Sequence, residues 1–494
     1  MRLLIDTNVL ISSEPTQLDD IEPLTALSIN LARLASGAHQ LLVHPRVTAE
    51  ITKDTNAERR ADRVQVQNRY PPVSHPPAIQ PELDQLLSRT QEGTNDWFDH
   101  LNLACVYGNA VDGLVTQDQG VHKKARLLGI DDRVFYLADA VAFLERLEDK
   151  PPDFVPSISW QPLHTIQLQD EFFDSLRDDY PEFNNWFTAA AREGREAFLI
   201  PGPIGECAGI CIVKPNDDQL ALGGKTTKVS TLKVADKYKG SRFGELLLKS
   251  LFRHAHQNRV ANLWLTVFPK HQELIALIQD FGFQEHGTHS SGELRFVKRL
   301  VPPPNAAPLT ALDYHITYGP PAVQPVREQT FVVPIRPEFH RGLFPDHRDA
   351  LERIQLTIPG TEAPTQPYGN AIRKAYLSSS NIRQIEPGAT LLFYRSRDVR
   401  AVTAVGVVER TFVSMNAEEI VAFVGSRTVY SMEQIVDRVS NGPVLSILFR
   451  HDRFLENPIG NREMLQNGLV RGAPQAIYRV RPEGFEWLIN RLAE

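Results

Sequence analysis

The sequence predicts a multidomain protein of the α/β and α+β classes, on three observations. With 494 residues, the chain is too long for one hydrophobic core and should form about three domains. Within residues 1–150, short apolar runs alternate with helical patterns, as in a parallel α/β sheet. Proline-rich stretches at 151–162 and 301–326 then separate this part from two further patterned regions.

The domain boundaries follow from these breaks. We expect domains at residues 1–150, 151–300 and 329–494. Residues 301–328, which include VPPPNAAP and YGPPAVQP, are predicted to form a Pro-rich linker. Proline fixes the backbone in extended conformations, so this linker should be extended and semi-rigid.

Composition narrows the class of protein. With 42% hydrophobic and 23% charged residues, the chain resembles ordinary soluble proteins. No apolar run approaches the roughly 20 residues that span a bilayer, and the N-terminus lacks a signal-peptide pattern, so we expect no membrane contact. Three cysteines are too few for a disulfide framework, which favours a reducing, cytoplasmic location. Cys207 and Cys211 are predicted on one face of a strand, as small core residues.

Charge is unevenly distributed. The net charge is −7, and the acidic surplus lies in the first two thirds of the chain. Among the basic residues of 325–494, Lys374 is the sole lysine. Arginine binds phosphates through its planar fork, so this bias hints at nucleic acid. The codon bias of a GC-rich genome explains it equally well.

Residues 1–150 place acids at strand ends or on the helix just after one. We expect these elements in order: a strand at 2–5, helices at 23–35, a strand at 40–44, helices from 47, at 81–88 and at 95–107, and a strand at 113–116. Asp6, Glu50, Asp99 and Asp118 follow or lie on these elements. In open α/β sheets, ligands bind beyond the carboxyl ends of the strands.

Four converging carboxylates would repel one another unless a cation lay between them. Hard oxygen ligands select Mg²⁺ or Mn²⁺, and such ions can activate water for phosphodiester hydrolysis. The alternative is that Asp6 caps the following helix, because Asp, Thr and Asn favour such positions. Asp96 and Asp112 lie nearby in sequence and are interpreted as surface acids.

The segments LLIDTNVL, VHPRVTAEI and DHLNLACVYGNAVDGLVTQD, in this order and spacing, resemble the PIN-domain family over residues 1–140. The resemblance implies a metal-dependent ribonuclease, of the kind found in toxin–antitoxin pairs. It implies that Asp6, Glu50, Asp99 and Asp118 are the catalytic, metal-binding acids. Asn8 and Thr116 match polar neighbours that orient ligands or water.

The central region continues with an α+β pattern. We expect helices at 171–177 and 181–193, strands at 196–201, 206–215 and 227–234, a helix at 245–257, a strand at 262–268 and a helix at 271–280. A glycine-bearing loop, 235–244, joins the third strand to the next helix. Such a loop presents backbone N–H groups to a phosphate.

The order strand, loop, helix, strand, helix, followed by Phe281-Gly282-Phe283, resembles the GNAT acyltransferases over about residues 160–297. This implies acetyl-CoA as cofactor, bound by the following residues: Leu232, Val234, Lys239, Gly240, Ser241, Arg242, Phe243, Gly244 and His271. Two positions depart from the family. Arg242 replaces the middle glycine of the pyrophosphate loop, and Ile278 stands where many members have the Tyr that protonates the thiolate. The sequence therefore leaves two alternatives: a catalytic acetyltransferase, or a GNAT scaffold that serves only in binding or assembly.

In the C-terminal region, short strands at 330–335, 371–377, 390–394, 401–410 and 444–450, with helices at 432–439 and 484–492, predict a small β-barrel. The segments IRQIEPGATLLFYRS, VTAVGVVER, VLSILFRHDRFLENPI and GAPQAIYRV resemble the PUA-like superfamily, closest to its ASCH-type members. This implies binding of RNA or modified bases. The candidate residues are Lys374, Tyr376, Ser378, Tyr394 and Arg395. The alternative is that these are ordinary strand residues on a solvated face.

Three hypotheses follow. In the first, the chain is a Mg-dependent endoribonuclease, the toxin of a toxin–antitoxin or defence system, with an acetyl-CoA-binding domain and an RNA-binding module. In the second, it is an acetyltransferase acting on RNA or protein, and the PIN-like domain binds substrate. The third is a non-catalytic binding protein. The intact acids and the missing Tyr favour the first, whose partners would be RNA, with tRNA as one candidate, a small antitoxin and a second copy of the chain.

Overall fold

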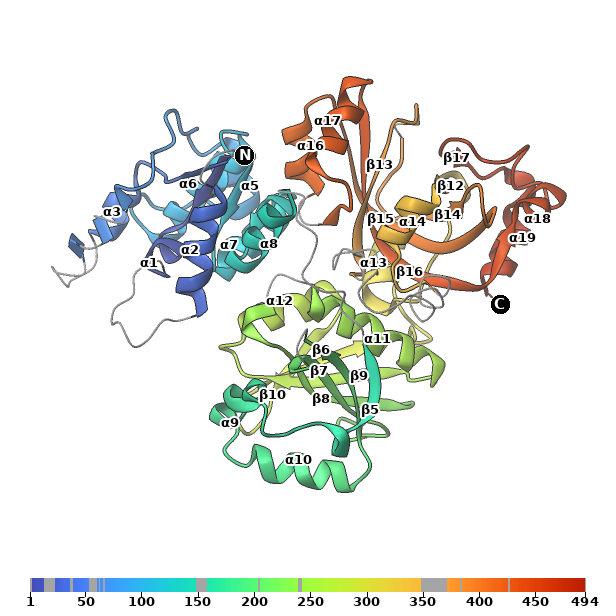
Figure 1. Ribbon diagram of the computed structural model, residues 1–494, viewed down its shortest axis with the longest axis horizontal. Helices are drawn as coiled ribbons and strands as arrows, with labels where there is room; N and C mark the ends of the chain where they lie inside the picture. Colours follow the sequence, from blue (N-terminus) through green and yellow to red (C-terminus); the bar gives the residue numbers. More distant parts are fainter. Residues whose placement is uncertain are drawn as a thin grey trace.

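A computed structural model describes residues 2–12, 23–35, 39–52, 60–61, 63–64, 67–147, 158–202, 205–238, 242–347, 371–382, 384–424 and 427–493. Three β-sheets, each with its own helices, are built from the N-terminal, central and C-terminal parts of this range (Figure 1). The predicted multidomain α/β and α+β architecture is confirmed at this level. Across the described residues, no helix has the length and apolar character needed to cross a bilayer.

The N-terminal sheet is parallel, as predicted. Its strand order is β2-β1-β3-β4, from β1 (Arg2–Ile5), β2 (Gln40–Leu42), β3 (Gly113–Val115) and β4 (Val134–Phe135). Successive side chains of a strand point to opposite faces, so Leu3 and Ile5 join one core cluster and Leu4 the other. Both faces are therefore buried, which accounts for the continuous apolar run of β1.

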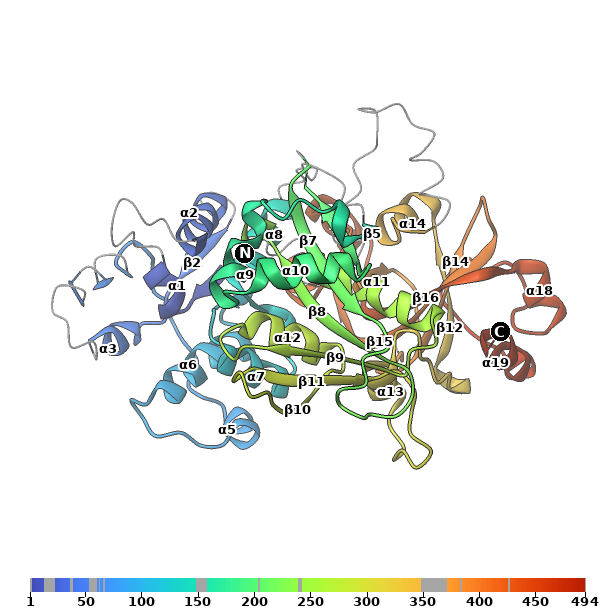
Figure 2. The same cartoon turned by 90° about the horizontal axis from the view of Figure 1, so that it is seen from below.

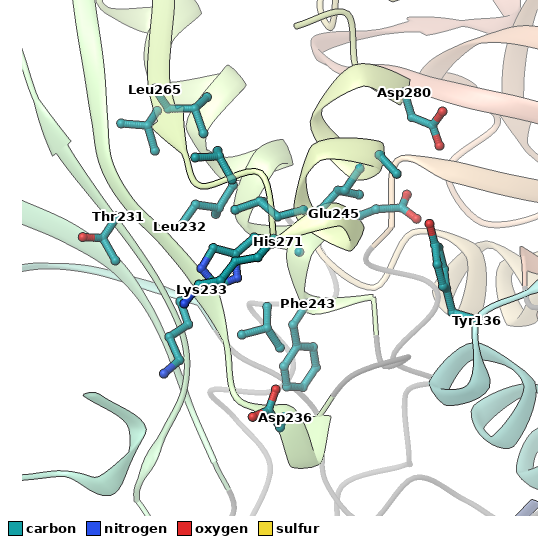
Figure 3. Close-up of a pocket in the computed structure, with 18 of the residues that line it drawn as sticks. Tyr136, Thr231, Leu232, Lys233, Asp236, Phe243, Glu245, Leu265, His271 and Asp280 are labelled. Atoms are coloured by element: carbon teal, nitrogen blue, oxygen red, sulfur yellow. The ribbon is translucent and has the colours of Figure 1, made fainter. Parts of the chain in front are cut away.

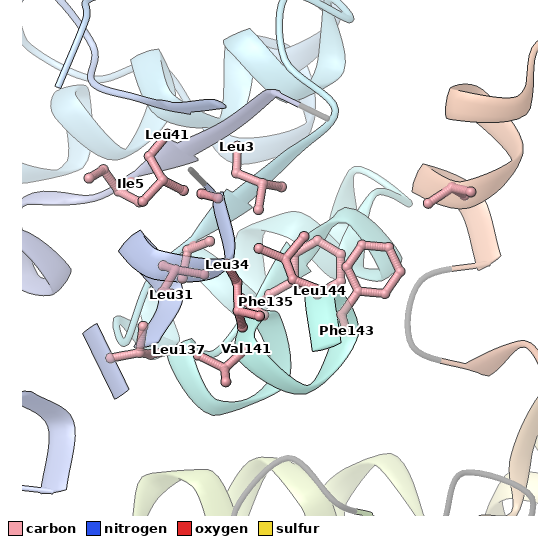
Figure 4. Close-up of a cluster of buried hydrophobic side chains, with 14 of the residues drawn as sticks. Leu3, Ile5, Leu31, Leu34, Leu41, Phe135, Leu137, Val141, Phe143 and Leu144 are labelled. Atoms are coloured by element: carbon pink, nitrogen blue, oxygen red, sulfur yellow. The ribbon is translucent and has the colours of Figure 1, made fainter. Parts of the chain in front are cut away.

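Helices cover both faces of this sheet. On the first face lie α2 (Pro23–Ala35) and α8 (Leu137–Leu147), whose leucines and Phe143 pack against β1 (Figure 4). On the second lie α6 (Asn95–Tyr107) and α7 (Gln119–Leu127). The shorter helices of this domain are α1 (Thr7–Ser12), α3 (Val47–Ile51) and α5 (Pro81–Leu87).

The central sheet has the order β10-β11-β9-β8-β7-β6-β5. Its strands are β5 (Ser159–Pro162), β6 (Glu196–Pro201), β7 (Cys207–Lys214), β8 (Thr226–Val234), β9 (Asn262–Val267), β10 (Gln284–Thr288) and β11 (Leu294–Arg299). The pair β8–β9 is parallel, and the other neighbours are antiparallel. One face packs against α11 (Phe243–Gln257) and α12 (Gln272–Asp280), the other against α9 (Asp174–Asp179) and α10 (Phe183–Arg192), which lies across β7 and β8 in Figure 2.

Cys207 and Cys211 are both buried core residues, but the prediction that they share a face is wrong. Cys207 belongs to the cluster under α10, whereas Cys211 belongs to the cluster under α11. The pairing of β6 with β7 shifts register between Ile200 and Pro201, next to Cys207. A bulge adds one residue to a strand and so reverses the face that the following side chains occupy.

The C-terminal sheet is open. Its order is β13-β16-β15-β14-β12-β17, from β12 (Thr330–Ile335), β13 (Arg373–Ser378), β14 (Thr390–Arg395), β15 (Ala401–Ser414), β16 (Val444–Gly460) and β17 (Tyr478–Arg479). The predicted closed β-barrel is not confirmed, because β13 and β17, at the two ends of the order, do not pair with each other in the described structure. The accompanying helices are α14 (Pro337–Leu343), α16 (Ala417–Val424), α17 (Met432–Ser440), α18 (Asn461–Gln466) and α19 (Phe485–Ala493).

The expected extended linker contains a helix, α13 (Ala311–Tyr318), which Thr310 caps by accepting the Asp313 N–H. Lys298 of β11 donates to the carbonyls of Ile316 and Thr317 at 3.0 and 3.1 Å. A cap and a docked helix C-terminus thus fix this segment against the central domain. The prolines on both sides of this segment favoured the prediction of an extended linker over that of a helix.

Arg373 of β13 joins the three domains. Its Nε lies 2.9 Å from Glu409 of β15, Nη1 lies 3.4 Å from Asp280 of α12, and Nη2 lies 3.5 Å from Asp131 in the N-terminal domain. Its backbone N–H also donates to Glu245 of α11 at 3.1 Å. The guanidinium fork can satisfy several carboxylates at once, which a lysine ammonium cannot do in the same geometry.

A second arginine reinforces this junction. Arg450 of β16 places Nε 2.5 Å from Glu409 and donates from Nη1 to the backbone carbonyl of Asp280 at 2.8 Å. Burial alone would raise the pKa of Glu409, but Arg373 and Arg450 outweigh it and hold this pKa well below its usual range. Glu409 is therefore ionised at neutral pH and anchors both guanidinium groups.

We predict that Arg373→Ala lowers the free energy of unfolding by about 3 kcal/mol, because the buried Glu409 and the partly exposed Asp280 and Asp131 each lose one cationic partner. Urea unfolding of the full chain measures this. The matched control is Arg471→Ala, an exposed arginine of the same domain, which should change stability by less than about 0.5 kcal/mol. Equal stability of the two variants would contradict a structural role for Arg373.

Candidate functional site

The central sheet opens between its two parallel strands. β8 and β9 are in register at Thr226↔Asn262, Thr227↔Leu263 and Lys228↔Trp264. Beyond this point each strand continues, β8 to Val234 and β9 to Val267, without further pairing between the two. The facing backbone groups of β8 can therefore pair with an extended ligand, as in strand addition.

A cleft of about 1430 Å³ occupies this opening. Its walls include Leu232 and Lys233 of β8, Leu265 of β9, Phe243 of α11, and His271 at the start of α12 (Figure 3). Pockets for drug-sized ligands measure roughly 300–1,000 Å³. The cleft thus has room for a long cofactor together with part of a second substrate.

The cleft reaches the N-terminus of α11, where helix N–H groups and the helix dipole favour an anion such as a phosphate. At the start of this helix there is little room for a side chain at position 244. A Cβ atom on Gly244 would lie 2.7 Å from Cδ2 of Leu277, which also lines the cleft. A larger residue at position 244 would consequently enter the space that a ligand needs.

Arg242 adopts the backbone conformation that glycine favours. As N-cap of α11 it has φ 60° and ψ 21°, in the left-handed region. This position is where the GNAT resemblance expects a glycine, and an arginine adopts it at a cost of roughly 1–2 kcal/mol. Its guanidinium lies 3.4 Å from Glu245 and 3.9 Å from Asp139 of the N-terminal domain. The substitution therefore adds a cation at the helix N-terminus.

The structure brings together most of the predicted cofactor-binding residues. Six of them line the cleft, namely Leu232, Val234, Arg242, Phe243, Gly244 and His271. Lys239, Gly240 and Ser241 lie outside the described residues.

Tyr180, Glu293 and Asp179 also line the cleft and were not identified from the sequence. Ile278 is fully buried in the core and has no proton to give. In the cleft itself, Tyr180 donates to Glu293 at 2.7 Å, and His271 Nε2 lies 2.6 Å from Asp179. The sequence carries only a weak signal for these residues, an acid and a tyrosine at the end of a short helix before a proline.

In the N-terminal domain, Asp6 lies at the carboxyl end of β1, surrounded by donors. Its Oδ1 accepts from the Thr7 N–H at 2.8 Å and Asn102 Nδ2 at 3.1 Å, and its Oδ2 accepts from Asn8 Nδ2 at 2.9 Å and Thr116 Oγ1 at 2.6 Å. Burial raises its pKa most, the Thr116 hydrogen bond opposes this, and nearby Glu50 adds to it, so the pKa is raised to about 7. Asn8 and Thr116 thus hydrogen-bond Asp6, and their role in orienting ligands or water stays a prediction.

The other three acids lie close enough to influence one another electrostatically, but each is already engaged. Glu50 accepts from Thr7 Oγ1 at 2.5 Å, and Asp118 accepts the Val121 N–H as N-cap of α7. Asp99 pairs with the Lys124 ammonium at 2.7 Å, which also pairs with Asp96 at 2.6 Å.

These acids do not fit a divalent cation as they are arranged. No group of three or more His, Cys, Asp or Glu side chains in the described part of the chain could hold a metal ion. The oxygens of Asp6 already accept four hydrogen bonds, and Lys124 supplies positive charge beside Asp99. The predicted Mg²⁺ or Mn²⁺ is thus unsupported. Asp96, with its side chain 69% exposed, is a surface acid as expected.

The candidate RNA-binding residues of the C-terminal domain lie on β13 and β14. All five are buried: Lys374, Tyr376, Ser378, Tyr394 and Arg395. The Tyr376 hydroxyl donates to the Pro334 carbonyl at 2.8 Å, and Arg395 pairs with Asp398 at 2.5 Å. They are therefore not on a solvated face, and their role in RNA binding stays a prediction.

Comparison with known proteins supports the similarity of the central domain to GNAT acetyltransferases. Residues 160–283 match the acetyltransferase (GNAT) family, so the chain contains a GNAT acetyltransferase domain. No curated protein matches the chain in sequence. The resemblance of residues 1–140 to PIN nucleases therefore rests on the sequence motifs alone.

Solved structures share parts of the fold at low sequence identity. ASCH from Zymomonas mobilis is 15% identical, with 33% of this chain and 95% of that chain covered and a TM-score of 0.25. A putative acyl-CoA N-acyltransferase from Klebsiella pneumoniae is 18% identical, with 30% and 98% covered and a TM-score of 0.24. A GNAT family acetyltransferase from Elizabethkingia anophelis with acetyl-CoA bound is 17% identical, with 29% and 98% covered and a TM-score of 0.21. At these TM-scores the likenesses establish no function.

We predict that Asp6→Asn stabilises the protein at pH 8 but not at pH 4. Because the folded-state pKa of Asp6 is raised to about 7 from 3.8, ionisation penalises the folded state increasingly between these values. At 1.36 kcal/mol per pKa unit, the full penalty above pH 7 is about 4 kcal/mol, which Asn avoids. Urea unfolding across this pH range measures the difference.

The control for this prediction is Glu92→Gln, an acid-to-amide change at an exposed position. At pH 8 it should change stability by less than about 0.5 kcal/mol. A wild type and an Asp6→Asn variant whose stabilities keep a constant difference from pH 4 to 8 would contradict the raised pKa.

Proposed function

We propose that the chain is an acetyl-CoA-dependent N-acetyltransferase that acts on an RNA or protein acceptor. The observation that carries this proposal is the opening between β8 and β9, which leads to the N-terminus of α11 within a domain matching the GNAT family. When bound, acetyl-CoA supplies an activated thioester. The acceptor nitrogen bonds to the acetyl carbon, the carbon–sulfur bond breaks, and a proton passes from nitrogen to sulfur.

The residues present fit such a cofactor. The unpaired edge of β8, including Leu232 and Val234, would pair with the amide groups of the pantetheine arm. The N–H groups at the start of α11, with Gly244 leaving room and Arg242 adding a cation, would hold the pyrophosphate. Both features lie in the same cleft.

The position of the N-terminal domain at the cleft supports a role of this domain in binding substrate. His122, Arg126, Tyr136 and Asp139 from α7 and the segment before and within α8 also line the cleft. An acceptor that enters the cleft would thus meet residues of the N-terminal domain as well as the central domain. This arrangement favours the hypothesis in which the PIN-like domain binds substrate for the transferase.

Metal-dependent ribonuclease activity is the second candidate. The observation that favours it is the proximity of Glu50 and Asp99 to Asp6, because their charges add to the effect of burial and raise the pKa of Asp6. Against it stand the hydrogen bonds and the Lys124 pair that already engage these acids. A toxin role, a small antitoxin and self-association belong to this candidate and have no support beyond it, whereas RNA is also an acceptor class of the first proposal.

Total RNA incubated with Mn²⁺ or Mg²⁺ tests the nuclease candidate. Since the acids are already engaged, we predict no cleavage above that of the Asp6→Asn variant, with a chelator-treated sample as background. Metal-dependent cleavage by wild type that Asp6→Asn lowers by orders of magnitude would instead establish the nuclease.

We predict that isothermal calorimetry detects acetyl-CoA binding to wild type and that Gly244→Glu weakens it at least about 100-fold, or about 2.8 kcal/mol. The new carboxylate would enter the narrow space beside Leu277 and repel the pyrophosphate. Gly472→Glu is the matched control, because a Cβ there meets nothing within 4 Å and it adds the same charge in the C-terminal domain. Absence of binding to wild type at millimolar acetyl-CoA would contradict the proposed function.

A further inference from the structure

The cleft contains a paired histidine and carboxylate. His271 Nε2 lies 2.6 Å from Asp179 Oδ2, and both residues line the cleft. The side chain of His271 is 44% exposed, whereas that of Asp179 is 8% exposed. In Figure 3 the imidazole of His271 lies next to Lys233 of β8, above Phe243 of α11. A buried acid therefore holds an imidazole that faces the opening.

Local structure fixes this pair. His271 is the N-cap residue of α12, just after β9, and Asp179 is the last residue of α9. The other carboxylate oxygen of Asp179 pairs with Lys270. Burial alone would raise the pKa of Asp179, but the hydrogen bonds from Lys270 and His271 outweigh it and bring the pKa below its usual value.

The state of the acid determines the tautomer of the histidine. An ionised Asp179 can only accept a hydrogen bond, so His271 Nε2 must carry the proton that it donates. In the neutral ring, Nδ1 then bears the lone pair. Nδ1 has no hydrogen-bond partner within the described residues. The imidazole thus presents a proton acceptor to the cleft.

Other charged groups near the imidazole do not compete for this role. Lys270 is engaged by Asp179, and Lys233 of β8 donates to the Phe172 carbonyl and Ser175. Asp236, after β8, lies on the far side of Phe243 from the α12 end of the cleft (Figure 3).

The second polar pair in the cleft is a weaker candidate. The Tyr180 hydroxyl donates to Glu293, and burial together with Glu293 raises the pKa of Tyr180 well above its usual value. Burial alone would raise the pKa of Glu293, but hydrogen bonds from Ser291 and Tyr180 outweigh it and lower this pKa, so its carboxylate is a weak base. Imidazole is the side chain that most often serves as a general base in enzymes.

We propose that His271, held in place by Asp179, is the general base of the transferase; this rests on the proposed function. Nδ1 takes the proton from the acceptor nitrogen, or from water, as that atom bonds to the acetyl carbon. The carbon–sulfur bond breaks, and the protonated Nδ1 returns the proton to the departing thiolate. One imidazole thereby supplies both transfers and replaces the acid that is missing at Ile278.

The rate test uses the full chain with acetyl-CoA, and with water and ethanolamine as acceptors, and measures release of the CoA thiol from pH 5 to 9. We predict that His271→Gln lowers kcat about 100-fold, within the range for a lost general base, and removes the rise in rate with pH. Calorimetry should show that acetyl-CoA affinity falls far less than kcat, so that weaker binding does not explain the lost rate. Asp179→Asn should lower kcat about tenfold, because the ring loses its orienting acceptor. His256→Gln, at an exposed position on α11, is the matched control and should behave as wild type.

A second measurement does not depend on turnover. Diethyl pyrocarbonate should modify His271 in the free protein, and CoA should protect it, as mass spectrometry of its peptide would show. His256 should be modified equally with and without CoA. If wild type binds no acetyl-CoA, the proposed function and this inference both fail. If it binds acetyl-CoA but never cleaves it, both fail as well. If His271→Gln keeps the wild-type rate and pH profile, or if CoA leaves His271 unprotected, the general-base assignment alone is wrong.

Discussion

A single guanidinium group contacts carboxylates of all three domains. Arg373 reaches Glu409 within its own sheet, Asp280 of the central domain and Asp131 of the N-terminal domain. Desolvating an arginine is costly, and this cost is offset because its donors meet several carboxylates and because Arg450 shares Glu409. Such a cluster favours one relative placement of its parts, since any sliding of a domain would separate buried charges.

This placement in turn fixes the end of α11 that faces the cleft. Glu245, in the first turn of that helix, accepts the Arg373 N–H and pairs with Arg242. Arg242 also approaches Asp139 of the N-terminal domain. The anion-binding end of the helix is thus bounded by residues of the two other domains. The function of the central domain is for this reason expected to be sensitive to changes far from the cleft.

Regular elements could be predicted from the sequence because their signals are local. The helices at 23–35 and 95–107 have the predicted bounds, set by apolar periodicity and, for the second, by the Thr94 cap. The pair His271–Asp179 could not be predicted, since 92 residues separate its members and only the folded sheet brings them together. The same holds for Lys124 and Asp99, which meet across two helices.

Predictions at strand ends and boundaries were less successful for related reasons. A bulge changed the face of Cys207, and an unclosed sheet replaced the expected barrel, because register and closure depend on partners distant in sequence. Proline-rich composition suggested an extended segment where α13 forms.

The buried thiols have a practical consequence for following the protein in solution. Burial raises the pKa of Cys105, Cys207 and Cys211 to about 12 each, and the thiolate is the reactive form. Alkylating reagents and mild oxidants should thus reach them only when the surrounding structure opens. Cys105 would report opening of the N-terminal domain, and Cys207 and Cys211 would report the two faces of the central sheet. The C-terminal domain has no cysteine and would give no signal of its own. Alkylation of a single cysteine introduced there would therefore report on opening of that domain.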